Sequence, residues 1–137
     1  MKMSPLDALI RFGYDNFSSG VPALPHFEVE EFRARANLSP GAFFDCFARR
    51  VAHDYFAAKM SFEVADIAMT SLNSYCLFQY DVSLPSYAQD VYVAFDQGEF
   101  KHTEDDASVD PEMKYTRPEI QALAIRDQIL GLKVESA

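Results

Sequence analysis

The stretch that decides the fold is SPGAFFDCFARRVAHDYFAA, residues 39–58. It opens with Ser39-Pro40, in which a residue that caps helix N-termini precedes a proline suited to the first helical turn. Large apolar side chains then recur every three to four residues along one helical face: Phe44, Phe47, Val51 and Tyr55. Phe43 and Cys46 widen this stripe. The pattern therefore predicts a central helix that is buried on more than one side.

The charged residues of the same stretch are spaced so that opposite charges can meet on one helix. Asp45 lies four residues before Arg49, and Arg50 lies four residues before Asp54. Side chains at this spacing are neighbours on the helix surface. We expect these two pairs to line the solvent side of the central helix.

Similar signals for the start of a helix occur on both sides of this stretch. Ser4-Pro5 repeats the start signal, Ser61 precedes a second long apolar stripe, and Pro85 can begin a further helix. Thr116 and Glu119 match the capping box, in which two side chains satisfy the first helical amides. These signals predict helices at residues 4–17, 26–36 and 39–58, from 61 past 76, at 85–98 and at 116–131.

The predicted fold class is therefore all-α, a single bundle-like domain of five or six helices over residues 1–137. It has an acidic loop at about 99–115 and a frayed tail at 132–137. We interpret the stripe of Asp66, Thr70 and Asn73 as an ordinary solvent face, in preference to an interhelical hydrogen-bond network or an extension of a binding surface. The expected core residues are Phe44, Phe47, Val51, Phe62, Met69, Leu72, Val91, Phe95, Leu123 and Leu130.

Composition points to a folded chain in a reducing compartment. Apolar residues make up 49% of the sequence, and 12 Phe and 7 Tyr are far too many aromatic residues for a disordered acidic chain. Cys46 and Cys76 both lie on apolar stripes, so we expect reduced, poorly reactive thiols. No apolar run is long enough for a bilayer, and no signal-peptide pattern opens the chain. The expected location is the cytoplasm.

Negative charge is concentrated in the second part of the chain. Residues 81–137 carry 12 acidic and 5 basic side chains, against 9 and 7 in residues 1–80. Such a field repels nucleic acid and anionic membranes, and it attracts a basic protein or a cation. Lys101 is the only base among the seven acids of the densest stretch, and the predicted partner-binding residues are these acids and three aromatic anchors: Tyr92, Asp96, Glu99, Phe100, Glu104, Asp105, Asp106, Asp110, Glu112 and Tyr115.

The sequence contains no clear catalytic or metal-binding constellation. His26, His53 and His102 belong to no ligand motif, so we interpret them as surface or hydrogen-bonded histidines. Cys46 is surrounded by phenylalanines, which disfavour a reactive thiolate. Hydrolase and phosphate-loop motifs are absent, and the acids do not reproduce the spacing of a calcium-binding loop. We therefore expect no enzymatic activity, cofactor or metal.

Two stretches resemble a known class of proteins. One is Met60–Asp66 followed by Met69 and Asn73, and the other is Leu84-Pro85 followed by Val91–Phe100. Together they look like the small, acidic, helical immunity proteins that bacteria encode beside polymorphic or contact-dependent toxins. The resemblance implies binding of one cognate toxin and inhibition by occlusion of its active site, with no catalytic residues.

Two other functions fit the same residues. An acidic regulatory or adaptor protein would also bind a basic protein surface. A small-molecule-binding domain would place its pocket between the Phe-rich central helix and its neighbours.

For the binding interpretation, neutralising Glu104, Asp105 and Asp106 together is expected to slow association while leaving the fold intact.

Overall fold

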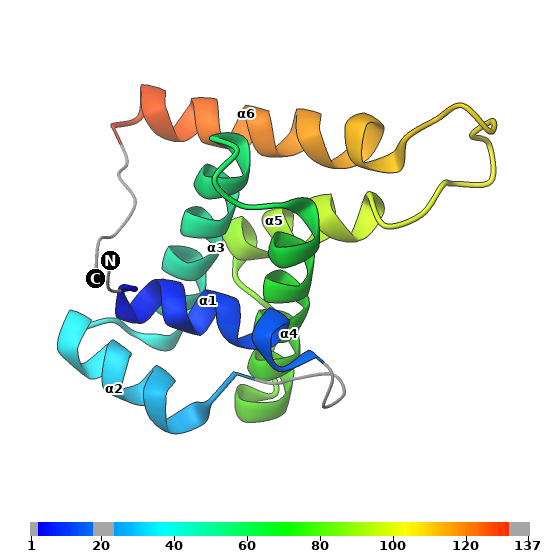
Figure 1. Ribbon diagram of the computed structural model, residues 1–137. Helices are drawn as coiled ribbons and strands as arrows, with labels where there is room; N and C mark the ends of the chain where they lie inside the picture. The colour runs from blue at the N-terminus through cyan, green and yellow to red at the C-terminus, as the bar shows by residue number, and fades with distance from the viewer. Residues whose placement is uncertain (1–2, 18–23, 132–137) are drawn as a thin grey trace.

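The computed structural model describes residues 3–17 and 24–131, so the predicted frayed tail at 132–137 lies outside the described residues. Within these ranges the protein is all-helical, as the sequence predicts, and contains no strand. Figure 1 shows the arrangement of its helices, which are α1 (Pro5–Asp15), α2 (His26–Ala36), α3 (Pro40–Phe56), α4 (Phe62–Tyr80), α5 (Ser86–Gln97), the π-helical turn η2 (Glu112–Thr116) and α6 (Arg117–Ile129).

Three helices begin where the serines of the sequence predict. The hydroxyl oxygens of Ser4, Ser39 and Ser61 each accept a hydrogen bond, at 3.1–3.2 Å, from the backbone amide three residues later. Each bond satisfies one of the amides that a helix leaves unpaired at its first turn. Local sequence therefore fixes the starts of α1, α3 and α4.

Helix α3 is the centre of the fold, as its apolar pattern predicts. It packs against α4, α5 and α6, while α1 lies across α4 and α2 covers α1 (Figure 1). Eight of the ten expected core residues are buried, and two are not. Phe62 is half-buried, with its ring 5.8 Å from that of Phe95, and Leu130 is 62% exposed just beyond the end of α6.

The charged residues of α3 bind other helices, and the predicted Asp45–Arg49 pair does not form. Asp45 accepts a hydrogen bond at 3.1 Å from the amide of Ala88, in the first turn of α5. Pro85 precedes α5 and supplies no side-chain cap. Asp45 of the neighbouring helix α3 therefore provides the hydrogen bond that a capping side chain would make. Arg50 pairs with Asp7 of α1 at 2.8 Å. The Asp45–Arg49 prediction was wrong because tertiary partners lie within reach of these side chains. The Arg50–Asp54 prediction is not contradicted, since the charge of Arg50 acts on Asp54 and opposes the rise in its pKa that burial causes.

A buried polar network joins α3, α5 and α6 at Asp127, whose side chain is fully buried. Its Oδ2 accepts hydrogen bonds from His53 Nε2 and Tyr87 Oη, both at 2.8 Å, and lies 3.4 Å from Arg49 Nε. Burial by itself raises the pKa of Asp127. The hydrogen bonds from His53 and Tyr87, with the charge of Arg49, nevertheless hold that pKa below its ordinary value. His53 is thus a hydrogen-bonded histidine, as expected.

The last helical segment begins earlier than the sequence analysis predicts. Pro111 is already helical, and the carboxylate of Asp110 accepts a hydrogen bond at 3.0 Å from the amide of Glu112. Thr116 is helical too (φ −86°, ψ −54°), so it is not the predicted cap. Its buried hydroxyl donates instead to the carbonyl oxygen of Ala94 on α5, at 2.7 Å. The expected loop at 99–115 therefore ends at Asp110.

Both cysteines are free. Cys76 is fully buried, its thiol lies 3.3 Å from the carbonyl oxygen of Val82, and burial raises its pKa. Cys46 packs against the core but keeps some exposed surface. The expectation of burial is thus confirmed for Cys76 and only in part for Cys46.

Gly98 is where α5 meets the start of the last helical segment, and it tolerates no side chain. A Cβ at this position would overlap Thr116 Oγ1 and lie 3.1 Å from Thr116 Cβ. We expect Gly98→Ala to lower the free energy of unfolding by about 1–3 kcal/mol, because overpacking forces the two helices apart. Urea denaturation measures this loss. Gly41→Ala is the matched control, since nothing lies near its Cβ, and equal stability of the two variants would refute the close contact.

Candidate protein-binding surface

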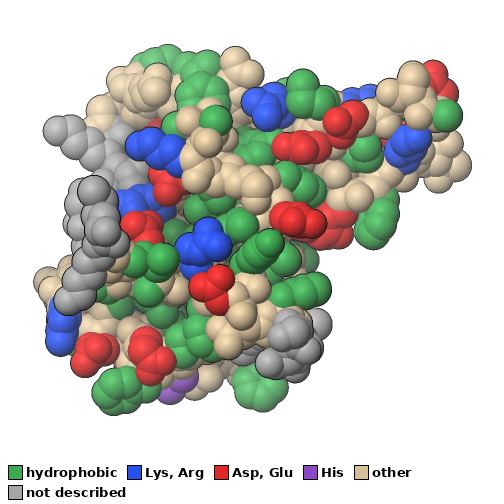
Figure 2. Space-filling view, in the orientation of Figure 1, with side chains coloured by type: hydrophobic (Ala, Val, Ile, Leu, Met, Phe, Trp, Pro, Cys, Tyr) green, Lys and Arg blue, Asp and Glu red, His purple; other side chains and the backbone are tan. Residues whose placement is uncertain are grey.

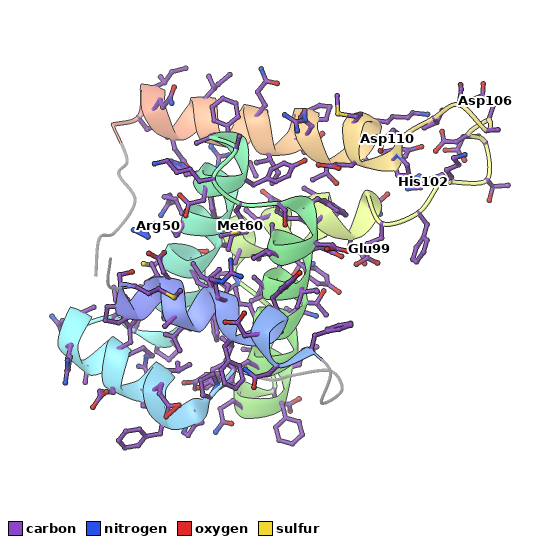
Figure 3. All side chains as sticks on the ribbon, in the orientation of Figure 1. Arg50, Met60, Glu99, His102, Asp106 and Asp110 are labelled. Atoms are coloured by element: carbon purple, nitrogen blue, oxygen red, sulfur yellow. The ribbon has the colours of Figure 1, made fainter. Side chains whose placement is uncertain are left out.

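The predicted acidic loop forms a protruding arm, residues 98–111, between α5 and η2. Figure 1 shows this segment extending beyond the ends of both helices, away from the rest of the molecule. In Figure 3 Glu99 marks its base, His102 and Asp110 its two sides, and Asp106 its tip. The arm thus carries most of the acids predicted for partner binding.

Asp105 holds the arm together. Its carboxylate accepts hydrogen bonds from the ammonium of Lys114, from the hydroxyl of Tyr115 at 2.6 Å and from the amide of His102 at 3.0 Å. These bonds, led by that from Lys114, hold the pKa of Asp105 well below its usual range. The side chain has no exposed surface, because its own partners cover it. Asp105 is therefore a structural centre of the arm.

Three further contacts brace the same segment. The ring of His102 stacks on that of Tyr115, with centroids 3.8 Å apart and planes 12° apart. His102 Nε2 also lies 3.1 Å from the carbonyl oxygen of Gln97. Lys101 reaches across the arm and donates to the carbonyl oxygen of Ala107 at 2.7 Å. The arm is consequently held in one shape without regular secondary structure, and both of its nearby lysines are used internally.

The seven acids of this region divide into outward and inward groups. Asp96, Glu104, Asp106 and Asp110 are exposed, and Figure 2 shows acidic side chains on the arm and at its base. Glu112 turns inward, where its carboxylate accepts a hydrogen bond from Tyr55 at 2.5 Å. Glu99 is half-buried at the base of the arm. The negative surface offered to a partner therefore consists mainly of the four exposed acids.

The three predicted aromatic anchors also differ in how far their side chains are exposed. Phe100 is 76% exposed at the base of the arm, beside Glu99. Tyr92 packs against the core, and the stacked Tyr115 is bound to Asp105. Of these three, only Phe100 offers a large exposed ring to a partner. An exposed aromatic residue beside acidic groups is typical of a binding anchor surrounded by steering charges.

A carboxyl pair lies at the base of the arm, where Asp66 of α4 hydrogen bonds to Glu99. Burial, this hydrogen bond and the charges of Glu99 and Asp96 raise the pKa of Asp66 to about 8. Asp66 therefore links α4 to the base of the arm, which favours the second of the three interpretations offered for this stripe.

The raised pKa of Asp66 predicts that stability falls as pH rises. Between the unfolded carboxyl pKa of about 4 and the folded value of about 8, the folded chain holds a proton that the unfolded chain has lost. Asp66→Asn removes this dependence. By about pH 9 the free energy of unfolding of the variant, relative to that of the wild type, should therefore have risen by about 1 kcal/mol or more. Urea denaturation from about pH 5 to pH 9 tests this. Asp90→Asn, at an exposed site on α5, is the control, and parallel curves for Asp66→Asn and wild type would contradict the pairing.

A groove between α1 and α2 has a mainly apolar lining. It has a volume of about 540 Å³, its walls include Leu9, Phe12 and Phe32, and Glu28, Glu31 and Arg35 lie at its rim. Arg35 and Glu31 pair with each other there, at 3.8 Å. No residue of α3 lines this groove, so it lies away from the site expected for a small-molecule pocket.

No family model, curated protein or solved structure matches this chain. In residues 3–17 and 24–131, no three His, Cys, Asp or Glu side chains are grouped as metal ligands. None of the helices in those ranges combines the length and apolar composition needed to cross a membrane.

Proposed function

We propose that this protein is an immunity-type inhibitor that binds a basic bacterial toxin domain and blocks its active site by occlusion. The single observation that carries the proposal is the arm at residues 98–111. It projects from the helical body, it is braced internally by Asp105, and it keeps Glu104, Asp106 and Asp110 exposed at and near its tip. A shape of this kind suits insertion into a concave, positively charged site.

Internal bracing supports binding because it lowers the cost of association. A flexible loop loses conformational freedom when it binds, and a loop already held in its bound shape loses less. The contacts of Asp105, His102 and Lys101 hold the arm before any partner is present. The exposed acids are then free to steer encounter, and Phe100 is placed to bury its ring at the contact.

The sign of the charge supports a toxin that acts on nucleic acid. Such an enzyme binds phosphates through Lys and Arg, so its active-site cleft is positive. The protein has a formal net charge of −9, and its arm presents acids on a narrow protrusion. An acidic protrusion can occupy the phosphate-binding surface of such a cleft and exclude the substrate.

The test is capture of the partner from the native host, followed by inhibition with purified proteins. The tagged protein and its variant Glu104→Gln/Asp106→Asn/Asp110→Asn are used as separate baits, and retained proteins are identified by mass spectrometry. We expect the wild type to retain a basic toxin domain and to abolish its activity at equimolar ratio. The variant should retain far less of it.

The matched control is Glu28→Gln/Glu31→Gln/Asp81→Asn. It removes the same number of charges from exposed positions on α2 and just after α4, at the end of the molecule away from the arm (Figure 1). It should capture and inhibit like the wild type. Capture of a basic regulatory protein with no toxic activity would replace the proposal with the adaptor function. Equal capture by all three baits would show that the arm is not part of the interface with the partner.

A further inference from the structure

Helix α6 carries a second apolar stripe that none of the other described helices covers. Its buried side chains, Ile120, Leu123, Ala124 and Asp127, face α3 and α5. Since residues in an α-helix are about 100° apart, the opposite direction is occupied by a separate set of side chains. These are all exposed and all apolar, at spacings of four, three and four residues: Pro118, Ala122, Ile125 and Ile129.

The isoleucines of this stripe are exposed to solvent. Ile129 is 79% exposed and Ile125 is 40% exposed, and Leu130 beside them is 62% exposed. Figure 2 shows hydrophobic side chains along the edge of the molecule where Figure 1 places α6. A row at spacings of three and four is the pattern that one helix presents to another in a coiled coil, and the small Ala122 allows close approach.

We propose that this stripe is the contact between two copies of this chain, packed through antiparallel α6 helices. The charges that flank the stripe select this occupant. Glu119 and Arg126 lie on one side of it, seven residues apart, and both are exposed. In an antiparallel pair related by a two-fold axis, each Glu119 meets the Arg126 of the other copy, so both ion pairs form at once.

The other flank is compatible with the same arrangement. Gln121 and Gln128 are exposed there, and they meet each other across the two-fold axis as hydrogen-bonding amides. A parallel pair would instead set the charged flank of one helix against the amide flank of the other and form neither ion pair. The stripe is therefore complementary to an inverted copy of itself.

The antiparallel arrangement leaves the acidic arm accessible. The arm leads into the N-terminal end of the η2–α6 segment and projects beyond it (Figure 1), so inverted copies hold their arms at opposite ends of the dimer. The stripe spans 12 residues, or roughly 18 Å at 1.5 Å per residue, which is short for an interface between subunits. We therefore expect dissociation in the micromolar range and a dimer that depends on concentration.

Sedimentation velocity of the full chain under reducing conditions tests the proposal. The wild type should pass from monomer to dimer across the micromolar range. Glu119→Arg and Arg126→Glu should each weaken the dimer by roughly tenfold or more, because like charges then oppose each other twice. An equimolar mixture of the two variants restores opposite charges at both contacts, so it should form a heterodimer.

Ile129→Asp tests the apolar part of the same contact and should give a monomer, while circular dichroism confirms that this exposed substitution leaves the fold intact. A wild type that remains monomeric at all concentrations would overturn the proposal. So would single charge variants that dimerise as well as the wild type, or a mixture that does not restore association. The measurement uses this chain alone, so its outcome is independent of the identity of any toxin partner.

Discussion

Replacing Asp127 with alanine is expected to lower the free energy of unfolding by about 3–5 kcal/mol. The substitution leaves His53, Tyr87 and Arg49 without the buried carboxylate that they share. Buried polar groups that lose their partners keep the cost of leaving water without the compensating bond. Because these groups come from α3 and α5, the loss also weakens the packing of α6 against both helices. Urea denaturation at neutral pH measures the effect.

Asp127→Asn separates the charge of this residue from its shape. The pKa of Asp127 is lowered in the folded state, so its charge contributes stability that is present above the unfolded carboxyl pKa. That contribution is lost as pH falls through the folded pKa, and the difference between wild type and Asp127→Asn should shrink in acid. Asp7→Ala, which removes the partly exposed partner of Arg50, is the control, with an expected loss within about 1 kcal/mol. Equal losses for the Asp127 and Asp7 alanine variants would contradict the network.

Neutralising the arm is expected to slow association with the partner by roughly tenfold at low salt, with little change in the dissociation rate. The substitutions are Glu104→Gln, Asp106→Asn and Asp110→Asn. Asn keeps a side-chain oxygen for the amides of Ser108 and Glu112, which these aspartates bind, so the arm should hold its shape. Binding kinetics on a surface that carries the captured partner provide the measurement.

Asp105 is left unchanged in this variant, although the sequence alone suggested neutralising it with Glu104 and Asp106. Its contacts with Lys114, Tyr115 and His102 make it part of the arm's structure, so its replacement would confuse loss of charge with loss of shape. Phe100→Ala provides the complementary test. Because it removes buried contact rather than charge, it should act mainly on the dissociation rate.

The helices could be predicted because their signals are local. Ser39-Pro40 and the stripe that follows it define α3 through contacts within a few residues. The same logic applied to Asp110-Pro111 would have placed the start of the last helical segment correctly, since Asp caps a helix as well as Ser does. The capping box at Thr116 was a coincidence of sequence. Its hydroxyl serves α5 instead, and no local pattern reveals a bond across 22 residues.

The sequence does contain one signal of the buried network. Asp127 follows Ile120, Leu123 and Ala124 at helical spacing, so it falls on the apolar face of α6. A charged residue in that position indicates a buried partner, because an isolated buried charge is costly. The sequence does not show that the partners are Arg49, His53 and Tyr87, since they come from helices whose packing is not encoded locally.

The sequence predicts that acidic residues cluster at 96–112, but it does not predict which of them are exposed. Composition shows seven acids between residues 96 and 112, yet hydrogen bonds in the folded chain decide which are exposed. Asp105 and Asp106 are adjacent in sequence, and one is enclosed by its partners while the other lies at the tip. The sequence places Asp66 in a polar stripe but does not predict its pairing with Glu99, because that contact depends on how α4 packs beside the arm.

The salt dependence of the association rate tests the central claim most directly. It is measured for the wild type, for Glu104→Gln/Asp106→Asn/Asp110→Asn and for the control Glu28→Gln/Glu31→Gln/Asp81→Asn, against the same partner. Steering by the arm predicts a rate that falls steeply with salt for the wild type and the control, and a lower, much flatter curve for the arm variant. Identical rates and slopes for the two triple variants would show that the arm does not steer binding.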